Sequence, residues 1–557
     1  MPLIFSLAVV LLASGSVLSP GVDPPPAGGD NSVNLFDLVD ECGMALSGEE
    51  AEACKPLREA VASGEVDLEI RDEDGSTPLI RAAEGDHEEA SRLLIEAGVD
   101  VNAQDADGKT ALMAAAVNRD SRALMQMLLD AGSDIDTVDR RRETALVFAL
   151  RSDDPDNIRF LLEAGAEVGV TVQRSDPFLN HVVRSRNSIH KQAIIRMLVE
   201  LGADVDVAGR QGMTPLMWAA RCCLEVAELL IELGADVSAE DRGGYTALMN
   251  AASSNEDPAM IQVLFRAGAD PNARNGLGNT VLMAAARNSN PEVTRAVLDL
   301  GVDVNAMTSA GLTALMCAAG INGESVNIPV LIEAGADVRV SSLGGDRTAL
   351  KFAAAYQKDR ESLRLILEAG ADIDDVGGFG DTPLMFAAGV NKHIDMMVFL
   401  LEQGADPTIR RIKGLSALML AARNRSEPER ITILLEAGAR CDARDDQGLT
   451  ALMLAAAHSS NPEVAARLIG AGAQVNATCR NGRTPLMWAA AWEGNGFRDR
   501  PAAAAELVEL LLAAGADPAR RDDSGRTALQ IARSNDRLKD GEVKARLEEL
   551  LSMSNRR

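Results

Sequence analysis

Aromatic residues and histidine are scarce in this sequence. Aromatic side chains make up 3% of the 557 residues, and five histidines are scattered along the chain. The hydrophobic 46% is therefore mostly Ala, Leu, Val, Ile and Met, a mixture that favours helices packed closely on small side chains. The sequence has no complete phosphate-binding loop motif and no His-Glu pair with zinc-ligand spacing. An enzyme, a cofactor and a metal site are therefore not expected, because catalysis needs reactive groups that converge in space.

Basic residues are also under-represented. Lys and Arg number 55 against 83 Asp and Glu, which gives a formal net charge of -28. The resulting negative field repels a phosphate backbone unless a local basic patch overcomes it. Nucleic acid is therefore not an expected partner.

Long apolar runs are absent except at the start of the chain. The run from Leu3 to Leu18 matches the core of a signal peptide, but Gly15 and Pro20 interrupt it before it reaches the length of a typical membrane span. No Lys or Arg precedes Lys55, so the usual basic segment is missing. We interpret residues 1–19 as a signal peptide and expect export, to the periplasm or as a secreted protein. An uncleaved N-terminal anchor and an apolar disordered tail are the alternatives, and no other membrane insertion is expected.

An internal repeat dominates the rest of the sequence. A Thr-x-Leu triplet, or a close variant, recurs mostly at intervals of 32 to 35 residues. It begins at Thr77, Thr110, Thr144, Thr214, Thr246, Thr280, Thr313, Thr348, Thr382, Ser416, Thr450, Thr484 and Thr527. The 70-residue gap after Thr144 holds a degenerate copy at Asp176-Pro177-Phe178, which makes about 14 units.

The residues of one unit predict two helices and a turn. Thr caps a first helix whose first turn accepts Pro215 without losing a hydrogen bond. A second helix begins at sequences such as Asn290-Pro291 and ends at a glycine such as Gly98, which can adopt the left-handed conformation. A turn such as Asp105-Ala106-Asp107-Gly108 then leads into the next Thr.

This pattern resembles the ankyrin repeat over roughly residues 57–551. The resemblance implies an all-α ankyrin-repeat solenoid of helix-turn-helix units with β-hairpin loops, about 14 repeats plus caps. It also implies that ligands bind across the hairpin tips and the concave helix face. The predicted boundaries are a Pro/Gly-rich linker at 20–34, an N-terminal cap of one or two helices at 35–76, the array at 77–526 and a C-terminal capping repeat at 527–557, whose last helix is expected from Glu542 to Leu551.

One departure from the family concerns the residue after Thr-Pro-Leu. The family commonly has His there, whereas most units of this chain have Met, so the usual polar network at that position is expected to be absent. We interpret the Met stripe as interior packing. The residues are Met113, Met217, Met249, Met283, Met316, Met385, Met419, Met453 and Met487.

Irregular units and charged tips supply the candidate partner-binding residues. Two hairpin tips are basic, one with Arg140, Arg141 and Arg142 and the other with Arg410, Arg411 and Lys413. Trp218, Phe352, Phe386 and Trp488 share one position on the first helix and form either an aromatic line on the concave face or packing between repeats. An insertion between Thr484 and Thr527 carries Trp492 and Phe497, either as an exposed contact loop or as a fold-back onto neighbouring helices.

A further irregularity is a basic island in the degenerate unit from Arg174 to Asp206. It is interpreted either as a decayed repeat with a solvated loop or as a docking site for an acidic partner. Its basic side chains are Arg174, His181, Arg184, Arg186, His190 and Lys191.

Seven cysteines are present. Cys42 and Cys54 both lie in the predicted N-terminal cap and are the pair expected to bond in an exported protein. The other five are expected to be buried small apolar residues rather than ligands or a second bridge. They are Cys222, Cys223, Cys317, Cys441 and Cys479.

Three functions fit these features. The first is a scaffold that binds a protein partner through hairpin tips and the concave helix face. The second is a secreted effector that acts on a host protein, and the third is a structural spacer. The partner's identity is not encoded in a motif, because the variable surface side chains set its specificity.

Overall fold

The computed structural model describes residues 34–43, 50–152, 154–167, 171–172, 176–185, 190–320, 326–423, 427–459, 461–491, 501–534 and 541–554. The predicted signal peptide at 1–19 and all of the predicted linker except its last residue lie outside these ranges. By its internal contacts, the chain divides into two compact units, Met1–Arg140 and Arg141–Arg557.

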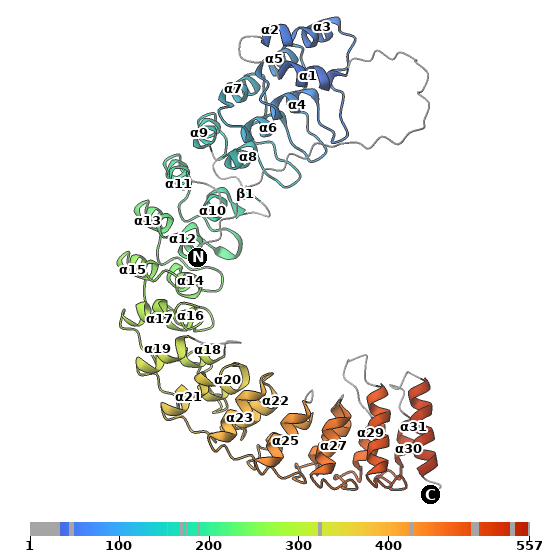
Figure 1. Ribbon diagram of the computed structural model, residues 1–557. Helices are drawn as coiled ribbons and strands as arrows, with labels where there is room; N and C mark the ends of the chain where they lie inside the picture. Colours follow the sequence, from blue (N-terminus) through green and yellow to red (C-terminus); the bar gives the residue numbers. More distant parts are fainter. Residues whose placement is uncertain are drawn as a thin grey trace, which may run out of the picture. The chain divides into compact units, whose positions relative to one another are not determined.

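The first unit contains three short helices followed by two helix pairs (Figure 1). These helices are α1 (Leu35–Gly43), α2 (Glu50–Ala53), α3 (Lys55–Ser63), α4 (Pro78–Glu84), α5 (Glu88–Glu96), α6 (Ala111–Val117) and α7 (Arg122–Asp130). The expectation of one or two helices before the array is therefore wrong. The reason is Pro56, in the first turn of α3: it has no amide hydrogen to donate to the carbonyl four residues earlier, so α2 cannot continue into α3 as one helix.

The second unit continues with helix pairs, each packed against the next (Figure 1). Its helices are α8 (Ala145–Ser152), α9 (Pro155–Glu163), α10 (Phe178–Arg184), α11 (Lys191–Glu200), α12 (Pro215–Ala220), α13 (Leu224–Glu232), α14 (Ala247–Ser254), α15 (Ala259–Arg266), α16 (Val281–Ala285), α17 (Pro291–Leu298), α18 (Ala314–Ala319), α19 (Asn327–Glu333), α20 (Ala349–Tyr356), α21 (Arg360–Glu368), α22 (Pro383–Gly389), α23 (Ile394–Glu402), α24 (Ala417–Arg423), α25 (Pro428–Glu436), α26 (Ala451–His458), α27 (Pro462–Gly470), α28 (Pro485–Ala491), α29 (Pro501–Ala513), α30 (Ala528–Arg533) and α31 (Gly541–Ser554). The last helix extends beyond its predicted range at both ends.

The degenerate unit folds as a complete helix pair, α10 and α11. Two short antiparallel strands, β1 (Thr171–Val172) and β2 (Asp176–Pro177), precede α10. Elsewhere in the described residues the hairpin loops contain only isolated bridges, such as that between Arg410 and Ser416. The chain is thus an all-α solenoid with hairpin loops, as predicted.

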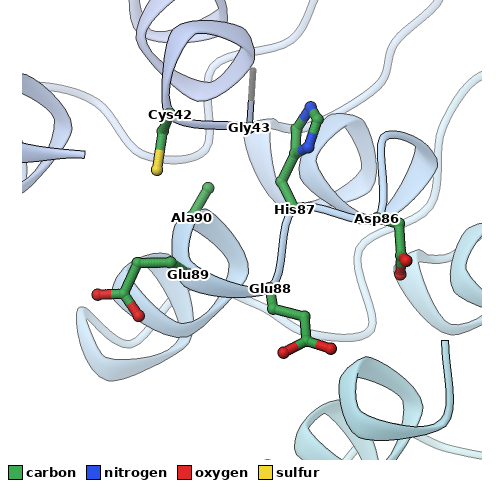
Figure 2. Close-up of a pocket in the computed structure, with 7 residues that line it drawn as sticks. All are labelled: Cys42, Gly43, Asp86, His87, Glu88, Glu89 and Ala90. Atoms are coloured by element: carbon green, nitrogen blue, oxygen red, sulfur yellow. The ribbon is translucent and has the colours of Figure 1, made fainter. Parts of the chain in front are cut away.

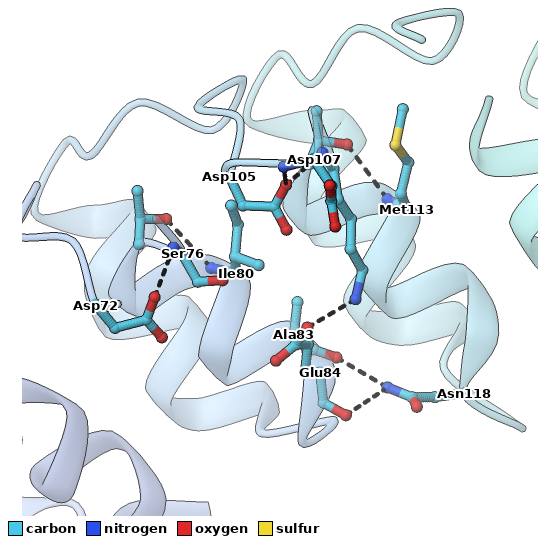
Figure 3. A network of polar contacts seen from close by, with 12 residues as sticks. Asp72, Ser76, Ile80, Ala83, Glu84, Asp105, Asp107, Met113 and Asn118 are labelled. Atoms are coloured by element: carbon cyan, nitrogen blue, oxygen red, sulfur yellow. Dashed lines mark hydrogen bonds and ion pairs between the residues drawn. The ribbon is translucent and has the colours of Figure 1, made fainter. Parts of the chain in front are cut away.

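Local hydrogen bonds shape each repeat, as Figure 3 shows for the first two repeats of the array. The Thr110 side chain caps α6 by accepting from the Met113 amide at 3.3 Å. In the preceding turn, Asp105 Oδ1 accepts from the amides of Asp107 and Lys109, both at 2.8 Å. The aspartate therefore fixes the turn, and the threonine starts the helix that follows it.

Side-chain amides join neighbouring repeats. Asn118 Nδ2 donates to the Ala83 carbonyl at 2.8 Å, at the end of the first helix of the preceding repeat (Figure 3). Equivalent bonds in the second unit, each 2.9 Å long, run from Asn255 to Ala220, from Asn288 to Ala252 and from Asn391 to Ala354. These amides satisfy carbonyls that the ends of the helices leave without a partner. An asparagine in the loop between the two helices thus connects the repeats.

The Met stripe is interior, as predicted. All nine methionines are at most 2% exposed, and their backbone amides belong to the first turn of the first helix. In the repeat that starts at Thr348, the same position holds Lys351, whose side chain is 1% exposed. Its ammonium lies 2.9 Å from Asp375 Oδ2, but neither atom makes a hydrogen bond of acceptable geometry.

We expect Lys351→Met to leave stability unchanged or to raise it by about 1 kcal/mol, because a buried ion pair rarely outweighs its desolvation cost. Asp375 is 28% exposed and can be solvated without the lysine. Asp375→Asn is the matched control and should destabilise the region by about 3 kcal/mol, since it leaves a buried ammonium without its counter-charge. Hydrogen exchange of residues 341–382 measures both effects locally. Greater loss of protection in the methionine variant than in the asparagine variant would contradict this account.

Candidate functional site

The hairpin tips of the second unit are tied to one another by backbone hydrogen bonds. The Leu343 amide donates to the Ala310 carbonyl at 3.0 Å, and the Ile412 amide donates to the Phe379 carbonyl at 2.8 Å. Between them, the Gly378 amide donates to the Gly345 carbonyl at 3.1 Å. The tips therefore form a ladder in which each is held against the next.

Three consecutive tips of this ladder expose apolar side chains. Leu343 is 73% exposed, Phe379 is 60% exposed and Ile412 is 57% exposed. We call these three residues the apolar tip row. They are not among the residues predicted from the sequence, where the tips differ most visibly in charge. The signal that could have identified them is a large apolar residue at turn positions where other repeats have Asp, Arg or Gly. Leu277, at an earlier tip, is 71% exposed.

The first basic tip lies at the boundary of the two compact units. Arg140 is exposed in the first unit, and its amide donates to the Asp107 carbonyl at 2.9 Å. Arg141 and Arg142 are exposed at the start of the second unit. Arg142 has a φ of 64°, at a position where Gly75 and Gly108 stand in the preceding hairpins. Its backbone is therefore in a conformation that costs an L-residue about 1–2 kcal/mol.

The second basic tip is partly engaged in structural contacts. Arg411 is half-buried and pairs with Asp381 at 3.1 Å. Arg410 is exposed at the position that Arg274 and Arg444 occupy in their own hairpins, where each guanidinium bridges to a carbonyl of the next repeat, at 2.7 Å and 2.6 Å. Lys413 is exposed at the tip. Only Arg410 and Lys413 thus present exposed charge here.

A surface cavity of about 590 Å³ adjoins this tip. Its lining includes three guanidinium groups, from Arg410, Arg440 and Arg444, together with the carboxylate of Asp442. Arg444 donates to the Thr478 carbonyl, and Asp442 accepts from the Gln474 amide. The cavity is therefore basic overall, and a carboxylate of a bound chain could be accommodated beside Arg440.

The candidate aromatic residues are half-buried, and an arginine guanidinium lies over the ring of three of them, Trp218, Phe352 and Trp488. The Arg184 guanidinium lies 4.4 Å from the centre of the Trp218 ring, and that of Arg483 lies 5.0 Å from the Trp488 ring. Phe386 is half-buried on α22. The first contact joins neighbouring repeats, because Arg184 belongs to α10 and Trp218 to α12, whereas Arg483 and Trp488 belong to the same repeat. Trp488 packs against a buried cluster that contains Met453 of the preceding repeat. Trp492 and Phe497, and with them Arg174 and Arg186 of the basic island, lie outside the described residues.

The cysteines differ in their surroundings. Cys42 and Cys54 form a disulfide between α1 and the start of α3. Cys317 and Cys479 are buried, as expected for small apolar residues. The expectation of burial is wrong for Cys222, which is exposed, and for Cys223 and Cys441, which are half-buried, because all three lie outside the helices.

A cavity of about 310 Å³ lies beside the disulfide (Figure 2). His87 and the carboxylates of Asp86 and Glu88 are among its lining residues. Burial, with smaller contributions from Glu88 and Asp120, raises the pKa of Asp86 to about 6, and burial lowers the pKa of His87. The imidazole is therefore neutral near pH 7, and the adjoining sulfur of Cys42 is bonded to Cys54. This arrangement offers no thiol for His87 to activate.

Neither a metal centre nor a membrane-spanning helix is seen in the described residues. No group of three or more His, Cys, Asp and Glu side chains there is placed to hold a metal ion. No helix of that part of the chain is long and apolar enough to cross a bilayer. The features that stand out are surfaces, namely the apolar tip row and the basic tips.

We expect Arg142→Gly to stabilise the second unit by about 1 kcal/mol, because glycine adopts a φ near 64° without steric cost. Arg142→Ala retains the Cβ atom and the strain, so it should give no gain. Urea unfolding of the two variants and the parent chain measures the difference. An equal gain in both variants would mean that the charge of Arg142, and not its backbone conformation, is the unfavourable feature.

Family comparisons agree with this architecture. The model described as ankyrin repeats (3 copies) matches residues 43–139, 97–172, 146–241, 248–342, 321–411, 350–445 and 418–498. The models for ankyrin repeats (many copies) and for the single ankyrin repeat match residues 219–265 and 481–523. Together they cover well over half of the chain.

Similar proteins include one from a bacterium and one from a mammal. The ankyrin repeat protein YahD of Escherichia coli (strain K12) is 30% identical over 168 residues, which cover 29% of this chain and 83% of YahD. Inversin of Canis lupus familiaris is 28% identical over 169 residues, which cover 28% of this chain and only 15% of inversin. The solved ankyrin repeat domain of human ASB11 is 28% identical, covers 40% of this chain and 97% of its own, and has a TM-score of 0.35. By its helix pairs, its hairpins and the family models that match more than half of its length, the chain belongs to the ankyrin repeat family.

Proposed function

We propose that this chain is a scaffold for protein–protein interaction whose partner docks on the apolar tip row. The observation that carries the proposal is the exposure of Leu343, Phe379 and Ile412, each more than half exposed, at three consecutive tips. Isolated surface apolar residues are ordinary, but exposed apolar residues on consecutive, adjoining tips are typical of an interaction site.

The geometry of the row suits an extended or helical segment of a partner. Stacked helices lie about 8–10 Å apart, so three consecutive tips span roughly 20 Å. The backbone bonds between tips hold the side chains at that spacing, which lowers the entropy that binding must overcome. A leucine, a phenylalanine and an isoleucine together offer enough apolar area for the centre of a small interface.

Basic side chains near the apolar tip row indicate what kind of partner segment the row fits. Arg410 and Lys413 are exposed on the tip that carries Ile412, and Arg440 lines the neighbouring cavity. A partner segment with apolar side chains along its centre and acidic side chains at one end matches this pattern. The basic tip thereby contributes to the same surface, while Arg411 is used within the hairpin by Asp381.

Other functions are less well supported. The net charge of -28 disfavours nucleic acid as a partner. An enzyme would need a reactive constellation, and the histidine cavity of the first unit has its nearby sulfur in a disulfide. A structural spacer would have no reason to keep apolar side chains on consecutive tips. A secreted effector is a scaffold of the same kind with a host protein as its partner.

We further propose that the protein works in an oxidising compartment, either the periplasm or outside the cell. The apolar segment at residues 1–19 supports export, with an uncleaved anchor as the alternative. The Cys42–Cys54 disulfide adds support, because such bonds persist mainly where thiols are not kept reduced.

Affinity capture from the source cell's extract tests the binding site, with the chain lacking residues 1–19 as bait. We expect Leu343→Ser, Phe379→Ser and Ile412→Ser together to reduce capture of the partner at least tenfold, because each removes buried contact area from the complex. Circular dichroism should show an unchanged fold, since the three side chains are exposed.

Leu277→Ser is the matched control, because Leu277 is as exposed as Leu343 but lies outside the row. It should leave capture unchanged. A second variant, Arg410→Ala with Lys413→Ala, should weaken capture less than the triple variant and make it less sensitive to salt. Full capture by the triple variant would move the site to the helix face, and failure of the parent chain to capture any partner would favour the spacer.

A further inference from the structure

Two adjacent cysteines form the short turn between α12 and α13. Cys222 and Cys223 follow Arg221, the C-cap of α12, and precede Leu224, the first residue of α13. The amides of both cysteines donate to the Ala219 carbonyl, at 3.0 Å and 2.8 Å. This tight turn brings the two sulfur atoms to 3.0 Å from each other.

The pair has the features of a reactive site rather than of packing. Cys222 is exposed, and Cys223 is half-buried. The described residues contain no group of three or more potential ligands that could hold a metal ion with these thiols. Thiols in contact on a surface have one characteristic reaction with each other, which is oxidation to a disulfide.

We propose that Cys222 and Cys223 are a reversible dithiol–disulfide site that is oxidised by low-molecular-weight disulfides of the glutathione class. This site is independent of the proposed binding function. It differs from the Cys42–Cys54 bond, which joins two buried residues separated by 12 positions.

The chemistry proceeds by two exchange steps. The Cys222 thiolate attacks one sulfur of the small disulfide, breaking its S–S bond, forming a mixed disulfide and releasing one small thiolate. The Cys223 thiolate then attacks the Cys222 sulfur, which forms the protein disulfide and releases the second small thiolate. The protein loses two electrons and two protons, and the small disulfide is reduced to two thiols.

Exposure assigns the first step to Cys222. Burial raises the pKa of the Cys223 thiol to about 11, and its hydrogen-bonded contact with Cys222 adds to that rise. Lys191 lowers this pKa and Glu225 raises it, and both effects are smaller. Cys223 is therefore mostly protonated near pH 7 and acts second, when the attacked sulfur is already in contact with it.

Ring geometry makes the bond easy to reduce. The Cα atoms of neighbouring residues joined by a trans peptide lie about 3.8 Å apart, below the usual range of about 4.4–6.8 Å for disulfides. The Cα atoms of Cys42 and Cys54 are 4.4 Å apart, within that range. A strained and exposed disulfide has a more oxidising potential than a buried one, so the two bonds should respond to different redox conditions.

Oxidation of the pair would restrict the backbone that connects α12 and α13. Cys223 is the N-cap residue of α13, and the Cys222 sulfur contacts the carbonyl of Trp218 on α12 at 3.9 Å. A disulfide ring would fix the backbone of the turn that joins these two helices. The site thus links redox state to the half-buried Trp218 and its stacked Arg184.

Mass spectrometry of the full chain, equilibrated in buffers of graded glutathione to glutathione-disulfide ratio, tests the proposal. Trypsin cleaves after Arg221 and Arg242, so Cys222 and Cys223 share a peptide that contains no other cysteine. We expect that peptide to lose two hydrogen atoms and to be half-oxidised at a ratio at which Cys42–Cys54 remains fully bonded. Adding excess reduced glutathione should restore both thiols.

Single substitutions separate the two steps. Cys223→Ser should trap a glutathione adduct on Cys222, and Cys222→Ser should form an adduct at Cys223 much more slowly. Cys441, which is half-buried and has no adjacent cysteine, serves as the control thiol in the same sample and should form adducts only. Stable glutathione adducts on the unsubstituted pair, persistent reduced thiols at every ratio, or oxidation no easier to reverse than at Cys42–Cys54 would each overturn the proposal.

Discussion

The contact between neighbouring hairpins is the constraint on which the rest of this structure depends. A Cβ atom on Gly244 would lie 2.7 Å from the Gly276 amide nitrogen of the next hairpin, and Gly244 also has a φ of 75°. Only glycine satisfies both conditions without displacing the backbone. Because each hairpin is held this closely to the next, the helices that follow it stack at a fixed spacing. Equivalent positions in successive repeats therefore have similar surroundings.

That uniformity gives each departure from the repeat a physical meaning. Nine methionines fill one interior position, so the single lysine found there, Lys351, must bring a counter-charge from the next hairpin. Arg142 holds a glycine conformation. Arg411 replaces the turn aspartate and instead pairs with Asp381. Lys351 and Arg411 are each compensated by an aspartate of an adjacent hairpin, as expected for an array in which a repeat contacts only its neighbours, whereas the strain at Arg142 is retained.

Much of this could be predicted from the sequence, because period and capping are local properties. The triplet spacing, the Thr caps and the helix-ending glycines were sufficient for the fold and for the interior Met stripe. The asparagine bonds between repeats were not predicted, since Asn118 and Asn255 sit in loops and each bonds to a carbonyl 35 residues earlier in the chain. The third helix of the N-terminal cap was not predicted for a different reason: the cap lacks the repeat motif from which the other helix boundaries were predicted.

Surface function is harder to read from sequence, because exposure depends on what a neighbouring repeat covers. Arg410 and Arg411 are adjacent in sequence, yet one is exposed and the other is held by the preceding hairpin. Leu343, Phe379 and Ile412 differ in type and in offset within their turns, and only the backbone bonds between tips show that they form one row. The same is true of Cys222 and Cys223. The sequence shows that they are adjacent, but only the structure shows that their sulfur atoms are in contact, because both amides donate to the Ala219 carbonyl in a tight turn. Side chains that take no part in holding the repeats together are free to acquire a function, and the candidates in this chain lie at tips and turns.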